Sequence, residues 1–158
     1  MSLATSRPAV PARLTEDEFE RWCTEEVRAE LVNGRVVVIS PVPAEHDQLQ
    51  LFLTSLLGGY LELRPQGRLA GPRFEARLRP GLRCLPDLHF VSKEHLDRVK
   101  GTYLEGAPDA AFEIVSPDSV GRDWRDKYSD YEAAGVREYW PKFRSWWWQI
   151  TATTFFRA

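Results

Sequence analysis

Hydrophobic residues recur every three or four positions in two long segments of the chain, which is the spacing of an amphipathic helix. Over 45–63 they are Leu49, Phe52, Leu53, Leu56, Leu57, Tyr60 and Leu61. Over 122–134 they are Trp124, Tyr128 and Tyr131. A shorter helix is predicted to begin after Thr15, because Thr15 and Glu18 form a capping-box pattern. The pattern therefore predicts two long helices and a short one.

Runs rich in β-forming residues predict the strands. Asn33-Gly34 lies between two such runs, and this dipeptide is the strongest short signal for a hairpin. Further strands are expected in the segments RFEARLR, CLPDLHFV, AAFEIVS, REYW and WWWQITATTFF. A short helix is expected from Glu94 to Val99. Together these elements indicate an α+β fold with a mixed β-sheet flanked by helices.

Length and composition are those of one compact domain. The chain has 158 residues, of which 43% are hydrophobic and 28% charged. We expect a flexible arm over 1–13 and a single domain over 14–158. No apolar run approaches the roughly 18 residues of a membrane helix, and two distant cysteines form no metal or disulfide pattern. These features make a cytoplasmic protein without membrane contact the expectation.

Charge limits the choice of partner. The formal net charge is -2, which gives no global attraction to nucleic acid. A polyanion site would therefore need a local cluster of some of the 21 lysines and arginines.

Two acidic residues stand in strands that otherwise read as apolar. Glu113 lies within AAFEIVS, and Asp87 precedes the run LHFV. Alternation places Asp87 on one face with His89, and pairing of the two strands could bring both carboxylates together. Two carboxylates that lie side by side repel each other, so the arrangement is stable only when one is protonated or a cation bridges them. With a nearby main-chain carbonyl they would suit Mg²⁺, which prefers oxygen ligands.

Each of these residues also has a purely structural interpretation. Asp87 could belong to a strand-entry turn after Pro86, and Glu113 could form a buried ion pair with an arginine. Lys127, on the margin of the second predicted helix, could point at the strand ends. Alternatively, it is a solvated lysine paired with Asp123, which is a common and weak surface interaction. The residues alone leave these alternatives open.

Several segments together resemble a known superfamily. PDLHFV, GAPDAAFEIVSP and RDWRDKYSDYEAAGVREYW resemble the core of the PD-(D/E)xK nucleases. Within that superfamily the chain is most similar to the Uma-two family of restriction-endonuclease-like proteins. A helix of the form LT-x-x-E-F, a hairpin of the form E-L-x-N-G and a histidine at the start of the long helix are also similar to that family. The resemblance runs from Leu14 to Trp140.

The resemblance implies a restriction-endonuclease-like fold and Mg²⁺-dependent hydrolysis of DNA phosphodiester bonds, with Mn²⁺ as the alternative ion. It implies that Asp87 and Glu113 are the metal-binding acids, together with the main-chain carbonyl of Ile114. Glu30 would be a further catalytic acid near the site. Lys127 would be the catalytic lysine that orients or deprotonates the attacking water.

The chain departs from the superfamily pattern in two places. Val115 stands where the catalytic lysine usually follows the second acid, so the assignment of Lys127 requires that the lysine has moved to the following helix. After Trp140 the tail differs from the family pattern. His46 is either a helix-start residue with a satisfied hydrogen bond or a functional residue, and the sequence leaves both alternatives open. His89 is either a core histidine or a residue lining the site.

Three functions remain in competition. The first is a metal-dependent endonuclease that acts on DNA. The second is a nuclease-fold module that binds nucleic acid or a protein partner without cutting, which the net charge and Val115 favour. The third is a domain whose acids only pair with arginines. We also expect a homodimer, because aromatic strand edges tend to be covered. Contacts to the substrate backbone are expected from Arg73, Arg77, Arg122 and Arg125.

Overall fold

The computed structural model describes residues 10–24, 27–115 and 123–143. The helices are α1 (Glu16–Trp22), α2 (Ala44–Leu63) and α3 (Asp123–Ala134), with a 3-10 helix η1 (Lys93–Arg98). The strands are β1 (Ala29–Val32), β2 (Arg35–Val38), β3 (Gly67–Ala70), β4 (Glu75–Arg79), β5 (Leu82–Cys84), β6 (Leu88–Ser92), β7 (Tyr103–Glu105), β8 (Ala110–Val115) and β9 (Glu138–Phe143). The strand predicted in WWWQITATTFF lies outside the described residues, as does most of the predicted arm.

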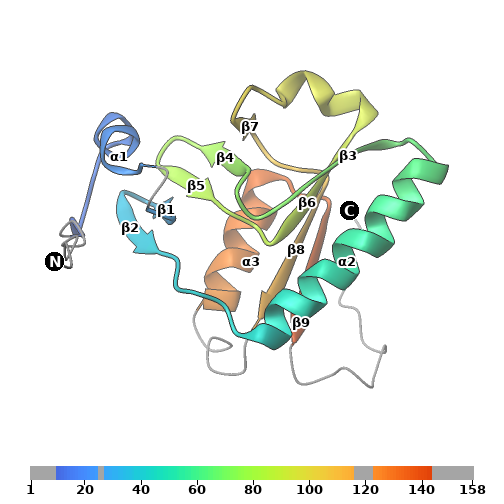
Figure 1. Cartoon of the computed structure of the whole chain (residues 1–158). Helices are drawn as coiled ribbons and strands as arrows, with labels where there is room; N and C mark the ends of the chain where they lie inside the picture. The colour runs from blue at the N-terminus through green and yellow to red at the C-terminus, as the bar shows by residue number, and fades with distance from the viewer. Residues whose placement is uncertain (1–9, 25–26, 116–122, 144–158) are drawn as a thin grey trace, which may run out of the picture.

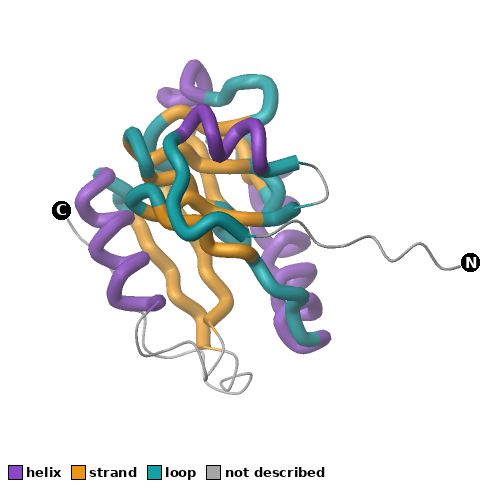
Figure 2. The backbone as a smooth tube through the Cα atoms, turned by 90° about the vertical axis from the view of Figure 1, so that its left-hand side faces the viewer, coloured by secondary structure: helices purple, strands orange, loops and turns teal. Residues whose placement is uncertain are grey.

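The strands form two mixed sheets. The first has the order β2-β1-β5-β4-β7, and the second has the order β3-β6-β8-β9. Parallel pairs join β4 to β7 and β8 to β9, whereas the other pairs are antiparallel. Helices α2 and α3 lie on opposite faces of the second sheet (Figures 1 and 2). The predicted α+β class is confirmed, but two sheets replace the single one that we expected.

Local signals fix the beginning of the domain. The capping box is present: the Glu18 amide donates to Thr15 Oγ1 at 3.3 Å, and the Thr15 amide donates to the Glu18 carboxylate at 2.8 Å. Asn33 and Gly34 both have positive φ, at 51° and 79°, which is the backbone a tight hairpin requires between β1 and β2. Both predictions from sequence are confirmed.

One predicted strand is broken, and the break determines where Asp87 lies. We expected CLPDLHFV to be continuous, but β5 ends at Cys84 and β6 begins at Leu88, in the other sheet. Pro86 has no amide hydrogen for a strand ladder. The amide of Leu85 donates to the Glu30 carboxylate at 2.9 Å instead of to a strand. Asp87 therefore stands at the crossing between the two sheets.

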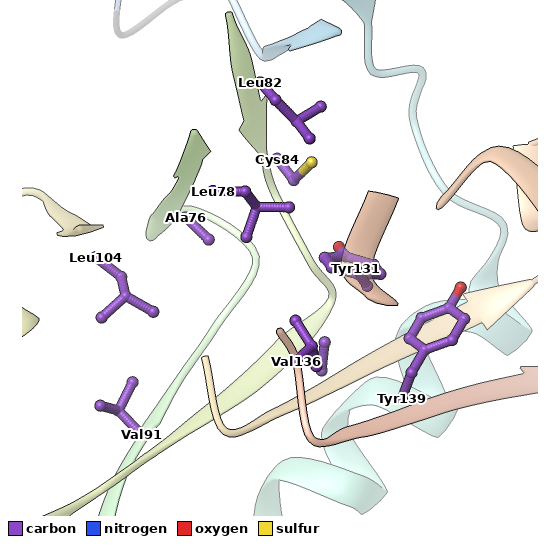
Figure 3. Packing of buried hydrophobic residues seen from close by; sticks show 10 residues of the cluster. Ala76, Leu78, Leu82, Cys84, Val91, Leu104, Tyr131, Val136 and Tyr139 are labelled. Carbon is purple, nitrogen blue, oxygen red and sulfur yellow. The ribbon is translucent and has the colours of Figure 1, made fainter. Parts of the chain in front are cut away.

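The main hydrophobic core fills the space between the two sheets and α3 (Figure 3). The first sheet contributes Ala76, Leu78, Leu82, Cys84 and Leu104, and the second contributes Val91, Ala111 and Tyr139. Tyr131 of α3 is 1% exposed within this cluster, so the helix is anchored by an aromatic ring. This anchoring fixes the position of the α3 residues that neighbour Tyr131.

The pairing of β6 with β8 confirms that the two acidic strands are neighbours. The register pairs Leu88 with Phe112 and His89 with Ala111 in antiparallel orientation. Continued by one residue, this register places Asp87 across from Glu113. Sequence patterns missed the short strands β3 and β7. None of the described helices is long and apolar enough to cross a membrane.

Candidate active site

Glu113 lies on β8 with its side chain directed at α3. The residue is only 8% exposed. Its Oε1 atom accepts two hydrogen bonds, from Lys127 Nζ at 3.0 Å and from the Tyr131 hydroxyl at 2.8 Å. Lys127 and Tyr131 are four residues apart, so one face of α3 presents both donors. Among the described residues the cation beside Glu113 is thus a lysine, not the arginine of the purely structural interpretation.

Asp87 is held by three other groups. Its Oδ2 atom accepts the backbone amide of Ile114 at 2.7 Å and lies 3.2 Å from His46 Nε2. The side-chain amide of Gln50 donates to the main-chain carbonyl of Asp87 at 3.0 Å. These contacts link the start of β6 to β8 and to the first turns of α2.

Glu30 connects the first sheet to the same place. It lies on β1, is 4% exposed, and accepts hydrogen bonds from the Leu85 amide at 2.9 Å and from Lys127 Nζ at 3.4 Å. The ammonium group of Lys127 therefore lies between two buried carboxylates that come from different sheets. The structure brings Asp87, Glu113, Glu30 and Lys127 into one connected cluster.

The electrostatics of this cluster are unbalanced. Burial raises the pKa of Glu113 to about 7. The ammonium of Lys127 opposes this rise, and the carboxylates of Asp87 and Glu30 add to it. Among the described residues, the Lys127 ammonium contacts Glu113 and Glu30, and the Asp87 carboxylate adds further negative charge, so a further cation would stabilise the cluster.

Lys127 is held in its protonated form. Burial disfavours the ammonium ion, but the carboxylates of Glu113 and Glu30 outweigh this effect and raise the pKa of Lys127 well above its usual range. A lysine with a raised pKa is a poor base at neutral pH. Of the two roles predicted from sequence, the arrangement favours orientation and charge stabilisation over removal of a proton.

The donor atoms suit a hard divalent cation. The two hydrogen bonds to Glu113 both go to Oε1, and the Asp87 contacts both go to Oδ2. Within the described residues, each acid thus has a second oxygen without a hydrogen bond. The backbone amide of Ile114 points toward Asp87. In a β-strand, the amide and the carbonyl of one residue point toward the same edge of the strand, so the Ile114 carbonyl also faces Asp87. That carbonyl would therefore complete a set of oxygen ligands. In the described ranges no three side chains of His, Cys, Asp or Glu group as metal ligands.

Other residues considered from sequence lie away from the cluster. His89 is fully buried, its ring stacks on Phe74 at 5.9 Å, and burial lowers its pKa to about 4. It is therefore a neutral core histidine. Arg77 pairs with Glu20 at 2.8 Å and with Glu75 at 3.1 Å, which makes it a poor candidate for a DNA phosphate. Arg73 and Arg125 are exposed, and Arg122 lies outside the described residues.

Sequence reasoning missed two residues of the cluster. Tyr131 was assigned to packing alone, although its position four residues after Lys127 could have shown that both face the same neighbour. Gln50 was not singled out, and its position four residues after His46 is the corresponding signal on α2.

Comparison with known proteins agrees with this fold. Residues 16–142 match the Uma2 family, described as "Putative restriction endonuclease". The chain belongs to the Uma2 family. The fold of this Uma2 chain is also similar to a crystal structure from Anabaena variabilis ATCC 29413, titled as a putative nuclease belonging to DUF820, with a TM-score of 0.68 and 18% identity. That match covers 82% of this chain and 74% of the other. No curated protein matches the chain.

Proposed function

We propose that this Uma2 chain is a metal-dependent endonuclease that hydrolyses DNA phosphodiester bonds. The observation that carries the proposal is the contact of Lys127 Nζ with Glu113 Oε1 at 3.0 Å, beside Asp87 and Glu30. A half-buried lysine beside carboxylates that can hold a metal ion suits metal-assisted phosphoryl transfer, because the ion and the ammonium can both offset negative charge. Membership in a family described as restriction endonucleases supports the same reaction class.

Asp87, Glu113 and the carbonyl of Ile114 would hold Mg²⁺, or Mn²⁺ as the alternative. When bound, the ion would polarise the phosphodiester and offset the charge that develops on it. Glu30 contacts Lys127 and the Leu85 amide, so its role in this proposal is to position both. The site would thus combine two ligating carboxylates with one positioning carboxylate.

Lys127 would act as a fixed positive charge. Its ammonium donates to Glu113 and Glu30, and a third hydrogen remains to orient a water molecule or a phosphate oxygen. In the reaction, the water oxygen forms a bond to phosphorus and one phosphorus–oxygen ester bond breaks. The attacking water loses one proton to solvent and the leaving oxygen takes up one proton from solvent, so the products are a phosphate monoester and a hydroxyl end. Lys127 would stabilise the negative charge on the phosphoryl oxygens during this exchange.

The test is a divalent-metal titration by calorimetry beside cleavage assays on supercoiled and single-stranded DNA. The parent protein should bind Mg²⁺ or Mn²⁺ and cut DNA only in its presence. Glu113→Gln should weaken metal binding and cleavage together. Glu132→Gln is the matched control, because Glu132 is an exposed glutamate on α3, and it should leave both unchanged. A parent protein that cuts equally well in EDTA would contradict the proposal.

The second candidate is a nuclease-fold module that binds nucleic acid or a protein partner without cutting. Val115 at the usual lysine position and the net charge of -2 favour it. Metal binding without hydrolysis of any DNA or RNA substrate would select this candidate. The homodimer prediction is tested separately by sedimentation, and a monomer at high micromolar concentration would contradict it. A cytoplasmic location fits either candidate.

A further inference from the structure

We infer that His46 and Gln50 of α2 act as positioning residues that hold Asp87 in the orientation needed for metal binding. This inference rests on the proposed function. The two residues lie one helical turn apart, and they contact different atoms of Asp87. His46 is the residue that α2 buries most completely, at 7% exposed.

Asp87 needs such support because of where it stands. It precedes β6 and follows Pro86, so the strand ladder does not begin until Leu88. Gln50 replaces the missing ladder contact by donating to the Asp87 carbonyl at 3.0 Å. The backbone of Asp87 is thereby tied to α2 instead of to a neighbouring strand.

His46 fixes the side chain of the same residue. An ionised carboxylate only accepts hydrogen bonds, so the 3.2 Å contact with Asp87 Oδ2 requires that His46 Nε2 carries the hydrogen. The Ile114 amide donates to the same oxygen at 2.7 Å. Two donors on Oδ2 set the rotation of the carboxylate and direct Oδ1 away from them. A metal ion would bind at Oδ1.

The same contact shows that His46 acts through Asp87. A nitrogen that carries a hydrogen has no lone pair for a metal ion, so Nε2 is not a ligand in this arrangement. The other ring nitrogen, Nδ1, is buried and has no hydrogen-bond partner among the described residues. A residue that hydrogen-bonds to a metal ligand orients that ligand, and its loss typically lowers metal affinity by about 10–100-fold.

The first test compares His46→Ala with His46→Gln by metal calorimetry and by cleavage at saturating DNA. His46→Ala should weaken metal affinity about 10-fold or more. The Gln amide can place a donor near the position of Nε2, so His46→Gln should restore affinity to within about 3-fold of the parent. The ratio of Mn²⁺ to Mg²⁺ affinity should not change, because no nitrogen ligand is lost. A His46→Gln variant as weak as His46→Ala, or a changed ratio, would overturn the inference.

Gln50 has a matched control on the same helix. Gln50→Ala should weaken metal affinity by up to about 10-fold. Gln48→Ala should leave it unchanged, because Gln48 is exposed two residues away. Equal effects of the two substitutions would overturn the assignment of Gln50.

The second test needs neither metal nor activity. Nitrogen-15 NMR of the histidine rings, assigned with the His46→Gln variant, should show a hydrogen on His46 Nε2 in the metal-free parent near neutral pH. If the parent protein binds metal and cuts DNA but His46 Nε2 carries no hydrogen, the positioning role is overturned while the proposed function stands. A parent that binds no metal in calorimetry would instead mean that the proposed function has failed.

Discussion

Two clusters of charged side chains link helices to sheets in this molecule, and they differ in balance. The first contains two cations, Arg83 and Arg77, of which Arg77 pairs with Glu20 and Glu75. Around Arg83, which is 3% exposed, the carboxylates of Glu16, Glu20 and Glu75 lie within 3.1–3.7 Å of the guanidinium. Around Lys127, the carboxylates of Glu113 and Glu30 lie at 3.0 and 3.4 Å. Both clusters join a helix to a sheet, so connectivity alone does not distinguish them.

Their electrostatics do distinguish them. In the Arg83 cluster, the hydrogen bond from the Gly81 amide is the main cause that lowers the pKa of Glu16. Burial opposes this effect, and the Arg83 guanidinium lowers the pKa further. In the Lys127 cluster, burial and neighbouring carboxylates raise the pKa of Glu113. The first cluster satisfies its acids, whereas the second leaves an acid that would be stabilised by an added cation. A raised carboxylate pKa beside a specific charge partner makes the second cluster the better candidate for a functional site.

The largest effect should come from breaking the first cluster. Arg83→Met removes the buried cation, although Arg77 still pairs with Glu20 and Glu75, so we expect a loss of about 3 kcal/mol in the free energy of unfolding, the lower end of the range for breaking a buried ion pair. Urea denaturation of the two proteins measures the loss. Metal affinity should be unchanged in the variant under conditions where it is folded. A loss below about 1 kcal/mol would show that Arg83 is not the centre of a buried network.

The second cluster should make stability depend on pH. The folded pKa of Glu113 is about 7, above its ordinary value of 4.5, so the folded protein binds more protons between these values. The contribution of Glu113 to stability is therefore fully present below about 4.5 and is lost as the pH rises through 7. The difference corresponds to about 3 kcal/mol at 1.4 kcal/mol per pKa unit.

Glu113→Gln removes this titration. The stability of the variant relative to the parent should therefore rise between pH 4.5 and 7, as measured by urea denaturation at several pH values without metal. A relative stability that stays constant across this range would contradict the raised pKa. Glu132→Gln serves as the control, because that glutamate is exposed.

Lys127→Ala should separate catalysis from metal binding. The loss of a positioned charge should reduce cleavage by at least about 10²-fold, which is about 2.7 kcal/mol. Metal affinity should fall far less than in Glu113→Gln, because Lys127 supplies no ligand. Single-turnover cleavage at saturating Mg²⁺ is the measurement. A variant that cuts as fast as the parent would remove Lys127 from the proposed catalytic set.

The smallest effect is expected at the exposed edge of the first cluster. The side chain of Glu16 is 38% exposed, and Glu16→Gln should cost below about 1 kcal/mol, as for other partly exposed ion pairs. The sign of its pH dependence is opposite to that of Glu113. Because the pKa of Glu16 is lowered, its contribution is present above 4.5 and is lost as the pH falls. Acid titration of parent and variant would reveal the difference, and identical curves would contradict it.

Local signals in the sequence determined much of the fold. The capping box at Thr15, the turn at Asn33-Gly34 and the periodicity of α2 and α3 each depend on residues close in the chain, so each could be predicted. The expected pairing of the strands that carry Asp87 and Glu113 is also confirmed by the register. Family resemblance singled out Lys127, since the residues alone favoured a surface lysine paired with Asp123.

Tertiary structure decided what local patterns could not. Pro86 favours a break at Leu85–Asp87 locally, but the partner of the Leu85 amide is Glu30, which is 55 residues away in the chain. The hydrogen bond from Tyr131 to Glu113 and the contacts of α2 with Asp87 likewise join distant segments. A carboxylate's pKa depends on the charges and the water around it, and these are set only when both sheets and both long helices pack together. The sequence thus determined which acids and which lysine the chain carries, and packing determined that they share one buried, negatively charged cluster.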